Sequence, residues 1–191
     1  MRAYRGQPRI FAPEKMKTRS AELKVENLCL NFGGIKAISN VDLEVHTGEL
    51  VAVIGPNGAG KTSLLNCITG FYKPSSGRII FNGTDVANLP THELTRLGIG
   101  RTFQNIELFP GMSVLDNMLL ARHTHCRYNF GLASLFWPSV KREEIHHREI
   151  LEEIIDFLEI QHVRKELVGS LPYRMRKRVE LGRALALEPS L

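Results

Sequence analysis

The stretch that most constrains the fold is ELVAVIGPNGAGKTSLLNCITG, residues 49–70. It begins with a short, nearly continuous apolar run, which predicts a strand buried on both faces of a parallel sheet. Glycines follow, and then a helical pattern. The segment GPNGAGKTS, from Gly55 to Ser63, has every fixed residue of the pattern G-x-x-x-x-G-K-[ST]. A strand, a glycine loop and a helix in this order predict a phosphate-binding loop in an α/β fold.

The chemistry of this phosphate loop favours a nucleoside triphosphate. Gly55, Gly58 and Gly60 let the backbone curl so that successive N–H groups face one anion, and the following helix adds its N-terminal partial positive charge. The ammonium of Lys61 is expected to reach the β- and γ-phosphates, and the hydroxyl of Thr62 to coordinate Mg²⁺. We therefore expect the whole loop to bind the triphosphate: Gly55, Pro56, Asn57, Gly58, Ala59, Gly60, Lys61, Thr62 and Ser63.

Strands and helices are predicted along the rest of the chain, which makes the fold class α/β. Strands are expected at 23–32, 38–46 and 78–83, and helices at 91–98, 113–122, 140–160 and after Pro172. Ser113 is the expected N-cap of its helix. Two helices carry apolar faces that should meet a core. These faces are Ile150, Leu151, Ile154, Ile155 and Leu158 in one helix, and Met175, Val179, Gly182 and Ala186 in the other.

The first 20 residues differ from the rest of the chain, with six Lys and Arg against one Glu. They lack the apolar core of a secretory signal, so we expect a disordered basic extension, with Met16 or a later codon as an alternative start. Residues 21–191 are then one nucleotide-binding domain. No stretch reaches the ~20 apolar residues of a membrane span. The net charge of +5 is modest, and no nucleic-acid partner is predicted.

The cysteines and histidines predict neither a disulfide framework nor a metal site. Cys29, Cys67 and Cys126 lack C-x-x-C spacing and are expected to be reduced thiols in a cytosolic protein. His123, His125 and Cys126 lie in an apparent loop, and His146 with His147 is an adjacent pair on a helix that cannot converge on one ion.

Two long segments carry a resemblance to a known family. The first is NFGGIKAISNVDLEVHTGELVAVIGPNGAGKTSLLNCITGFYKPSSGRIIFNG, and the second is GIGRTFQNIELFPGMSVLDN. Together they resemble the ATP-binding subunits of ABC transporters, most closely those of branched-chain amino-acid importers, over about residues 22–191. The resemblance implies a P-loop ATPase core with an antiparallel β segment and a helical subdomain at about 113–187. It also implies a pair of such subunits on the cytoplasmic face of the plasma membrane, bound to integral-membrane permease subunits.

The resemblance also implies roles for single residues. Phe32 matches the aromatic side chain that stacks on adenine, although a strand-end phenylalanine is more often a core residue. Gln104 matches the glutamine that ligates Mg²⁺ and senses the γ-phosphate, so Gln104 and Lys61 are the expected catalytic residues. An exposed loop glutamine is the simpler alternative. Residues 105–112 would lie near the permease.

The segment LPYRMRKRVELGRALALEPSL resembles the family's signature motif and the helix behind it. Leu171, Pro172 and Tyr173 fit the motif, but Arg174 stands where the family has glycine. In the family this motif closes on the γ-phosphate of ATP bound by the partner subunit. Arg174 adds a bulky cation at the positive end of a helix dipole. Either it weakens the motif, or it substitutes as a phosphate ligand.

In the family, a strand ending in an aspartate and a glutamate follows this helix and supports hydrolysis. The resemblance therefore implies a chain that lacks the C-terminal part of the core, and it leaves two hypotheses. The first is the ATP-hydrolysing subunit of an importer, represented by an incomplete chain. The second is a nucleotide-binding remnant or regulatory subunit without hydrolysis. A small-molecule kinase or GTPase conflicts with the signature-like segment and with the residues around Gln104.

Overall fold

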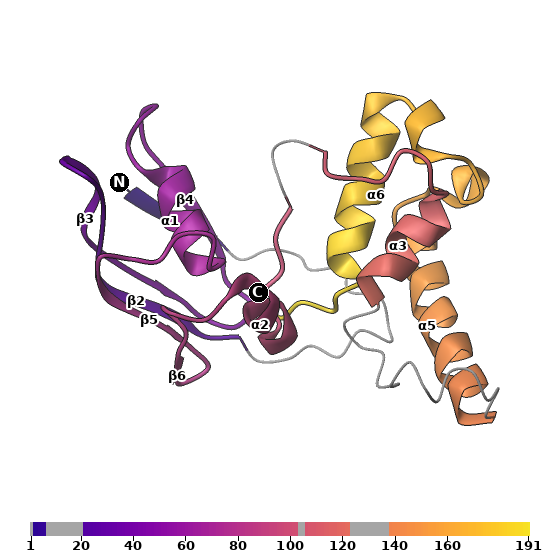
Figure 1. Ribbon diagram of the computed structural model, residues 1–191, viewed down its shortest axis with the longest axis horizontal. Helices are drawn as coiled ribbons and strands as arrows, with labels where there is room; N and C mark the ends of the chain where they lie inside the picture. Colours follow the sequence, from indigo (N-terminus) through magenta and orange to yellow (C-terminus); the bar gives the residue numbers. More distant parts are fainter. Residues whose placement is uncertain (1, 7–20, 103–105, 123–137) are drawn as a thin grey trace. The chain divides into compact units, whose positions relative to one another are not determined.

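The computed structural model describes residues 2–6, 21–102, 106–122 and 138–191. The chain divides into two compact units (Figure 1). Among the described residues, the first unit comprises 2–6, 21–99 and 190–191, and the second comprises 100–102, 106–122 and 138–189.

The first unit holds two antiparallel sheets and two helices. One sheet has four strands in the order β3-β2-β5-β6, and the other pairs β1 with β4. The strands are β1 (Arg2–Gly6), β2 (Leu23–Phe32), β3 (Ile35–Val45), β4 (Leu50–Ile54), β5 (Ser76–Phe81) and β6 (Thr84–Asp85). The helices are α1 (Lys61–Ile68) and α2 (Thr91–Leu97). The predicted strands at 23–32, 38–46 and 78–83 and the predicted helix at 91–98 are confirmed.

One face of the four-stranded sheet and the helices build the core of this unit. Leu23, Val25, Leu28 and Leu30 of β2 are buried at irregular spacing, because the register with β3 shifts between Val25 and Leu30. Helix α1 adds Leu64, Cys67 and Ile68, and α2 adds Leu94. Aliphatic burial of this kind contributes about 25 cal/mol per Å² and holds the strands and helices together.

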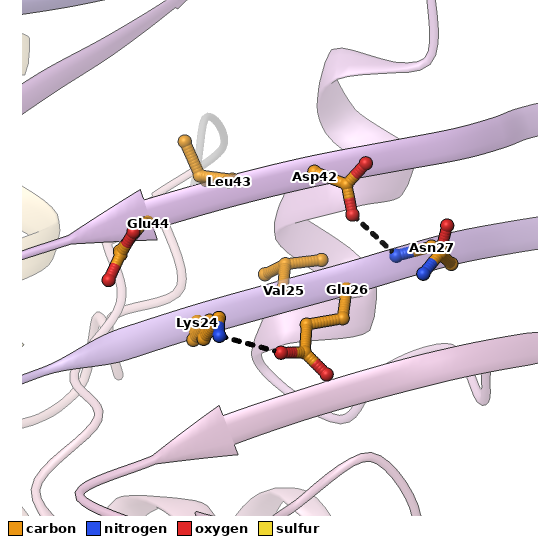
Figure 2. Close-up of a pocket in the computed structure, with 7 residues that line it drawn as sticks. All are labelled: Lys24, Val25, Glu26, Asn27, Asp42, Leu43 and Glu44. Carbon is orange, nitrogen blue, oxygen red and sulfur yellow. Dashed lines mark hydrogen bonds and ion pairs between the residues drawn. The ribbon is translucent and has the colours of Figure 1, made fainter.

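The opposite face of β2 and β3 carries charged side chains around a shallow pocket (Figure 2). Lys24 and Glu26 form an ion pair at 2.8 Å, and Asp42 accepts a hydrogen bond from the Asn27 backbone N–H at 2.7 Å. Asn27 has φ +48°, so the Asp42 carboxylate fixes the strand where its register shifts. The hydrogen bond to Lys24 lowers the pKa of Glu26, and Glu26 raises the pKa of Lys24. The Lys24–Glu26 ion pair lies at the surface, with side chains 50% and 21% exposed, and contributes little to stability.

The strand β4 is where the sequence expected it, but its surroundings differ from the prediction. Leu50 and Ile54 are 59% and 58% exposed, whereas Val51 and Val53 pack against the core. The prediction of burial on both faces in a parallel sheet is therefore wrong for the described residues. In the structure, β4 pairs antiparallel with β1, and the next strand, β5, pairs antiparallel with β2. Among the described strands, β4 therefore has no parallel neighbour.

The segment expected to be a disordered extension contains β1. Residues Arg2–Gly6 pair with β4 from Arg2 opposite Ile54 to Gly6 opposite Leu50. This pairing satisfies backbone N–H and C=O groups at the edge of β4, and the disordered extension expected over residues 1–20 stays a prediction. Residues 7–20 lie outside the described part of the chain.

The second unit is helical. It contains α3 (Val114–Arg122), α5 (Pro138–Phe157), α6 (Tyr173–Leu185) and the short 3₁₀ helices η2 (Gln161–Val163) and η3 (Val168–Ser170). The predicted helices at 113–122, at 140–160 and after Pro172 are confirmed. The expected subdomain at about 113–187 lies inside this unit. Its core is aliphatic, with these residues buried: Val114, Met118, Ile150, Leu151, Ile154, Ile155, Leu158, Ile160, Val163, Val168, Leu171, Val179 and Ala186.

Three local predictions in this unit are confirmed in detail. The Ser113 hydroxyl accepts a hydrogen bond from the Asp116 backbone N–H at 3.1 Å, which makes Ser113 the N-cap of α3. In α6, Gly182 lies on the buried face, where a Cβ would come within 3.0 Å of Leu158 and Met118. The stripe predicted along α5 is also buried.

A buried arginine, Arg122, joins three parts of the second unit by hydrogen bonds. Arg122 is 3% exposed, and its guanidinium donates to Nδ1 of His147 at 3.1 Å, to the carbonyl of Ala186 at 3.0 Å and to Glu188 at 2.6 Å. A buried charge is tolerated only when it is paired in this way. Arg122 therefore connects α3, α5 and the end of α6.

Candidate functional site

The phosphate loop lies between β4 and α1, and its backbone has the curl that its glycines predict. Gly58 has φ +83° and Gly60 has φ +80°, in the left-handed region that favours glycine. A Cβ on Gly60 would lie 2.4 Å from the carbonyl oxygen of Ala37 in β3. The absence of a side chain at Gly60 thus allows the loop to pack directly on β3.

Helix α1 begins at Lys61 with its N-terminus open toward the loop. Its N-cap is Gly60, no side chain caps it, and its first turn carries no acidic residue. The N–H groups of residues 61–63 have no carbonyl partner within the helix, because the first such bond joins the Leu64 N–H to the Gly60 carbonyl at 2.9 Å. Uncapped N–H groups and the helix dipole favour an anion at this position.

The side chain of Lys61 lies over the loop. Its Nζ donates to the carbonyl of Gly55 at 2.7 Å and to the carbonyl of Pro56 at 2.7 Å. These two bonds hold the ammonium close to the N-terminus of α1, where a phosphate group would be stabilised by both. Thr62 is exposed in the first turn of the same helix. The structure therefore brings the predicted residues Gly55 to Ser63 together in one open loop.

Phe32 lies at the end of β2 and is 46% exposed. It is thus not the core residue that the simpler alternative required. Its ring meets the ring of Tyr72 edge to face, with centroids 5.1 Å apart and planes at 80°. In the hairpin, Phe32 is paired with Ile35, two residues before the Ala37 carbonyl that Gly60 contacts. The same hairpin therefore carries Phe32 and supports the phosphate loop.

Tyr72 was missed by the sequence analysis. It stands just after α1, in the segment FYKPSSG, and the only signal in the sequence is an aromatic residue next to a predicted turn. Its ring fixes the orientation of Phe32, because an edge-to-face pair contributes about 0.5–1.5 kcal/mol beyond area burial.

Gln104 lies outside the described residues, so its predicted role stays a prediction. The signature-like residues belong to the second unit. Leu171 is buried, and Pro172, with φ −56° and ψ 151°, is the N-cap of α6. Tyr173 is 62% exposed and Arg174 is exposed in the first turn of the helix, which has no acidic residue. Arg174 thus adds its positive charge at the positive end of the helix dipole, as the sequence predicted.

The histidines and cysteines were not predicted to form a site. His146 is exposed, whereas His147 is buried and accepts a hydrogen bond from Arg122. Cys29 and Cys67 are free, and burial raises the pKa of the Cys67 thiol to about 11. His123, His125 and Cys126 lie outside the described residues.

Within the described ranges, one group of three potential ligands comes together: Glu22, Glu44 and His46, whose ligand atoms lie within 4.8 Å of one another. Their side chains are 62%, 43% and 51% exposed. Exposed groups of this kind are common on protein surfaces, and none of these three residues was predicted from the sequence to belong to a site. In the described part of the chain, no helix is both long and apolar enough to cross a membrane.

Comparisons with known proteins agree with this geometry. A family model described as "ABC transporter" matches residues 38–191. The high-affinity branched-chain amino acid transport ATP-binding protein BraF of Pseudomonas aeruginosa is 38% identical over 170 residues, which cover 88% of this chain and 66% of BraF. The chain thus spans about two thirds of the length of the curated relatives it matches.

Solved structures give the same result. The ADP conformation of MJ1267, an ATP-binding cassette of an ABC transporter, is 35% identical with a TM-score of 0.70, over 88% of this chain and 66% of that one. The dimeric bacterial ABC transporter cassette MJ0796 is 27% identical with a TM-score of 0.69, and the match covers 87% of this chain and 70% of the MJ0796 chain. The expected fold, a P-loop ATPase core with an antiparallel β segment and a helical subdomain, is confirmed. With the phosphate loop, the antiparallel sheet, the helical unit and the matched family model in agreement, the chain belongs to the ABC transporter family.

Proposed function

We propose that this chain binds ATP with Mg²⁺ at its phosphate loop and is the ATP-binding part of an ABC importer for branched-chain or related amino acids. The observation that carries the nucleotide assignment is the loop itself. Two left-handed glycines, the uncapped start of α1 and the Lys61 ammonium meet at one open position. The importer assignment rests on the similarity to BraF.

In this proposal each predicted residue has a role in binding the nucleotide. The backbone N–H groups of residues 61–63 hold the phosphate oxygens, and Lys61 neutralises the β- and γ-phosphates. Thr62 and Gln104 hold Mg²⁺, which supplies further positive charge at the phosphates. Phe32, supported by Tyr72, stacks on the adenine ring, and such a stack contributes about 1–3 kcal/mol by analogy with base stacking.

The partners in this proposal are a second ATPase subunit and the integral-membrane permease subunits, which place the chain at the cytoplasmic face of the inner membrane. The dimeric form of MJ0796 supports a pair of cassettes. In such a pair, Leu171–Arg174 faces the nucleotide of the partner subunit. Binding of ATP draws the pair together, and hydrolysis lets it separate.

Hydrolysis is the second part of the proposal, with Lys61 and Gln104 as its catalytic residues. Arg174, in place of the glycine, bears on this part alone, because the phosphate loop lies in the other unit. The measurement is ATP turnover by the purified chain, alone and in its assembled complex. Turnover in the complex supports the transport ATPase, whereas binding without turnover in both would assign the non-hydrolysing nucleotide-binding subunit instead.

The test of nucleotide binding is titration with a fluorescent ATP analogue in the presence and absence of Mg²⁺. We expect Lys61→Ala to weaken binding at least about tenfold, because hydrogen bonds to charged groups contribute about 1.5–3 kcal/mol. The matched control is Lys24→Ala, which removes a lysine from β2 of the same unit, where it is paired with Glu26. Equal affinities of the two variants would contradict the assignment of the loop.

A further inference from the structure

The second unit contains a polar side chain that the proposed function does not use. Asn117 in α3 is completely buried. Its Oδ1 accepts a hydrogen bond from the Phe109 N–H at 2.9 Å, and its Nδ2 lies 3.0 Å from the carbonyl of Phe109, 3.4 Å from that of Met112 and 3.0 Å from that of Ser113. Asn117 thus holds the backbone of Phe109–Ser113, which we call the clamped loop.

The clamped loop is also bonded to the segment that leads into the signature-like motif. We call Arg164–Ser170 the pre-signature segment. Its Val168 N–H donates to the carbonyl of Met112 at 3.0 Å, and its Gly169 N–H donates to the carbonyl of Pro110 at 2.9 Å. Ser113 and Leu167 form an antiparallel bridge between the two segments. The start of α3 continues this pairing, since the Val114 and Leu115 N–H groups donate to the carbonyls of Glu166 and Arg164 at 3.1 and 3.0 Å.

Two further contacts make the connection tight. A Cβ on Gly169 would lie 3.0 Å from the carbonyl oxygen of Pro110, so the two backbones meet without a side chain between them. The guanidinium of Arg183 in α6 donates to the carbonyl of Glu107, just before the clamped loop. Helix α6 is therefore bonded to this region from both directions, directly through Arg183 and through the pre-signature segment that precedes Leu171.

We propose that Asn117 is a positioning residue that makes the clamped loop, the pre-signature segment and the start of α6 move as one rigid body. A displacement of the clamped loop, whose Phe109 is 50% exposed, then shifts the Leu171–Arg174 motif instead of being absorbed locally. The consequence for catalysis rests on the proposed function, because it assumes that the motif meets a nucleotide. The mechanical connection itself does not.

The first test is amide hydrogen exchange in Asn117→Leu, which keeps a side chain of similar size and removes the hydrogen bonds. We expect exchange to rise about tenfold or more at Phe109, and also at Val168, Gly169 and Met175, whose N–H donates to the Pro172 carbonyl at 3.0 Å. The control is Ile155→Val, a mild core change in the same unit that touches none of these bonds. Faster exchange at Phe109 alone would overturn the proposal.

A second variant keeps the test informative if Asn117→Leu does not fold. Gly169→Ala acts on the opposite side of the connection, because its methyl group pushes Pro110 away by a few tenths of an ångström. We expect faster exchange at Phe109 and Met175 in this variant too. In the double variant, the combined effect should be smaller than the sum, because both changes break one connection. Additive effects would mean two independent local perturbations and would contradict the proposal.

The kinetics of ATP hydrolysis distinguish a positioning role of Asn117 from a purely structural role. In the assembled complex we expect Asn117→Leu to lower kcat about tenfold while KM for ATP stays unchanged, because the phosphate loop lies in the other unit. Rising exchange with unchanged kcat would overturn the positioning role. Failure of the wild-type chain to bind the ATP analogue would instead overturn the proposed function, and the exchange results at Met175 would still decide the connection.

Discussion

The phosphate loop and the clamped loop are both irregular segments next to a helix, yet they are held in opposite ways. The phosphate loop has exposed residues at Pro56–Gly58 and owes its conformation to glycines with positive φ. The clamped loop is held by a buried side chain, Asn117, and by backbone bonds to a distant segment. At the end of the first loop, the N–H groups of residues 61–63 stay available to a ligand, whereas the second loop uses its polar groups within the fold.

This difference indicates where a substitution changes binding and where it changes stability. Changes in the phosphate loop should alter nucleotide affinity more than the stability of either unit. Changes around the clamped loop and its core should alter the stability of the second unit and leave the affinity for nucleotide intact. Substitutions in the two units can break or sharpen this contrast.

The largest effect is expected from the core of the second unit. Leu151 is completely buried in α5, so Leu151→Ala should lower the free energy of unfolding by about 2–5 kcal/mol. The measurement is denaturant unfolding, with Leu120→Ala, 43% exposed on α3, as the control with a small effect. A large loss of nucleotide affinity in folded Leu151→Ala would contradict the contrast.

The two left-handed glycines of the phosphate loop should differ from each other. A Cβ on Gly58 meets no atom within 4 Å, so Gly58→Ala should carry only the conformational cost of about 1–2 kcal/mol. In Gly60→Ala the methyl group also meets the Ala37 carbonyl, which adds about 1–3 kcal/mol of overpacking. We therefore expect Gly60→Ala to weaken binding of the ATP analogue more than Gly58→Ala. The reverse order would mean that β3 does not support the loop.

The N-cap of α3 has a smaller effect. Ser113→Ala removes the acceptor for the Asp116 N–H and should destabilise the second unit by about 0.5–2 kcal/mol. Thr95→Ala is the control, because its exposed hydroxyl in α2 bonds only to the preceding turn and should matter little. Urea unfolding of both variants measures the difference. Equal stabilities would show that the cap does not hold the start of α3.

Another effect concerns pH and Cys67 in α1. Because burial raises the pKa of this thiol from 9.0 to about 11, the unfolded chain loses the proton at lower pH than the folded one. The contribution of Cys67 to stability is therefore complete below about pH 9 and is lost as the pH rises toward 11. Cys67→Ala should remove this component, so the stability difference from wild type should shrink between pH 9 and 11. A stability difference between wild type and Cys67→Ala that stays constant from pH 9 to 11 would contradict this prediction.

Much of the candidate site could be predicted because its determinants are local. The spacing of the glycines, Lys61 and Thr62 specifies a loop that a few neighbouring residues can build on their own. The N-cap at Ser113 and the apolar stripe of α5 follow from spacings of three or four residues along one helix. The role of Phe32 could be suggested from the sequence, but its support by Tyr72 could not.

Local sequence thus specifies the phosphate loop, the order of the longer helices and strands from β2 onward, and the faces that those helices bury. Only the tertiary structure decided that β4 pairs with β1, that Arg122 and His147 are buried together, and that Asn117 and Gly169 join the clamped loop to the pre-signature segment. The physical reason is sequence separation. Propensity, capping and loop glycines act within a few residues, whereas burial and backbone pairing join segments tens of residues apart, and a local pattern carries no record of its distant partner.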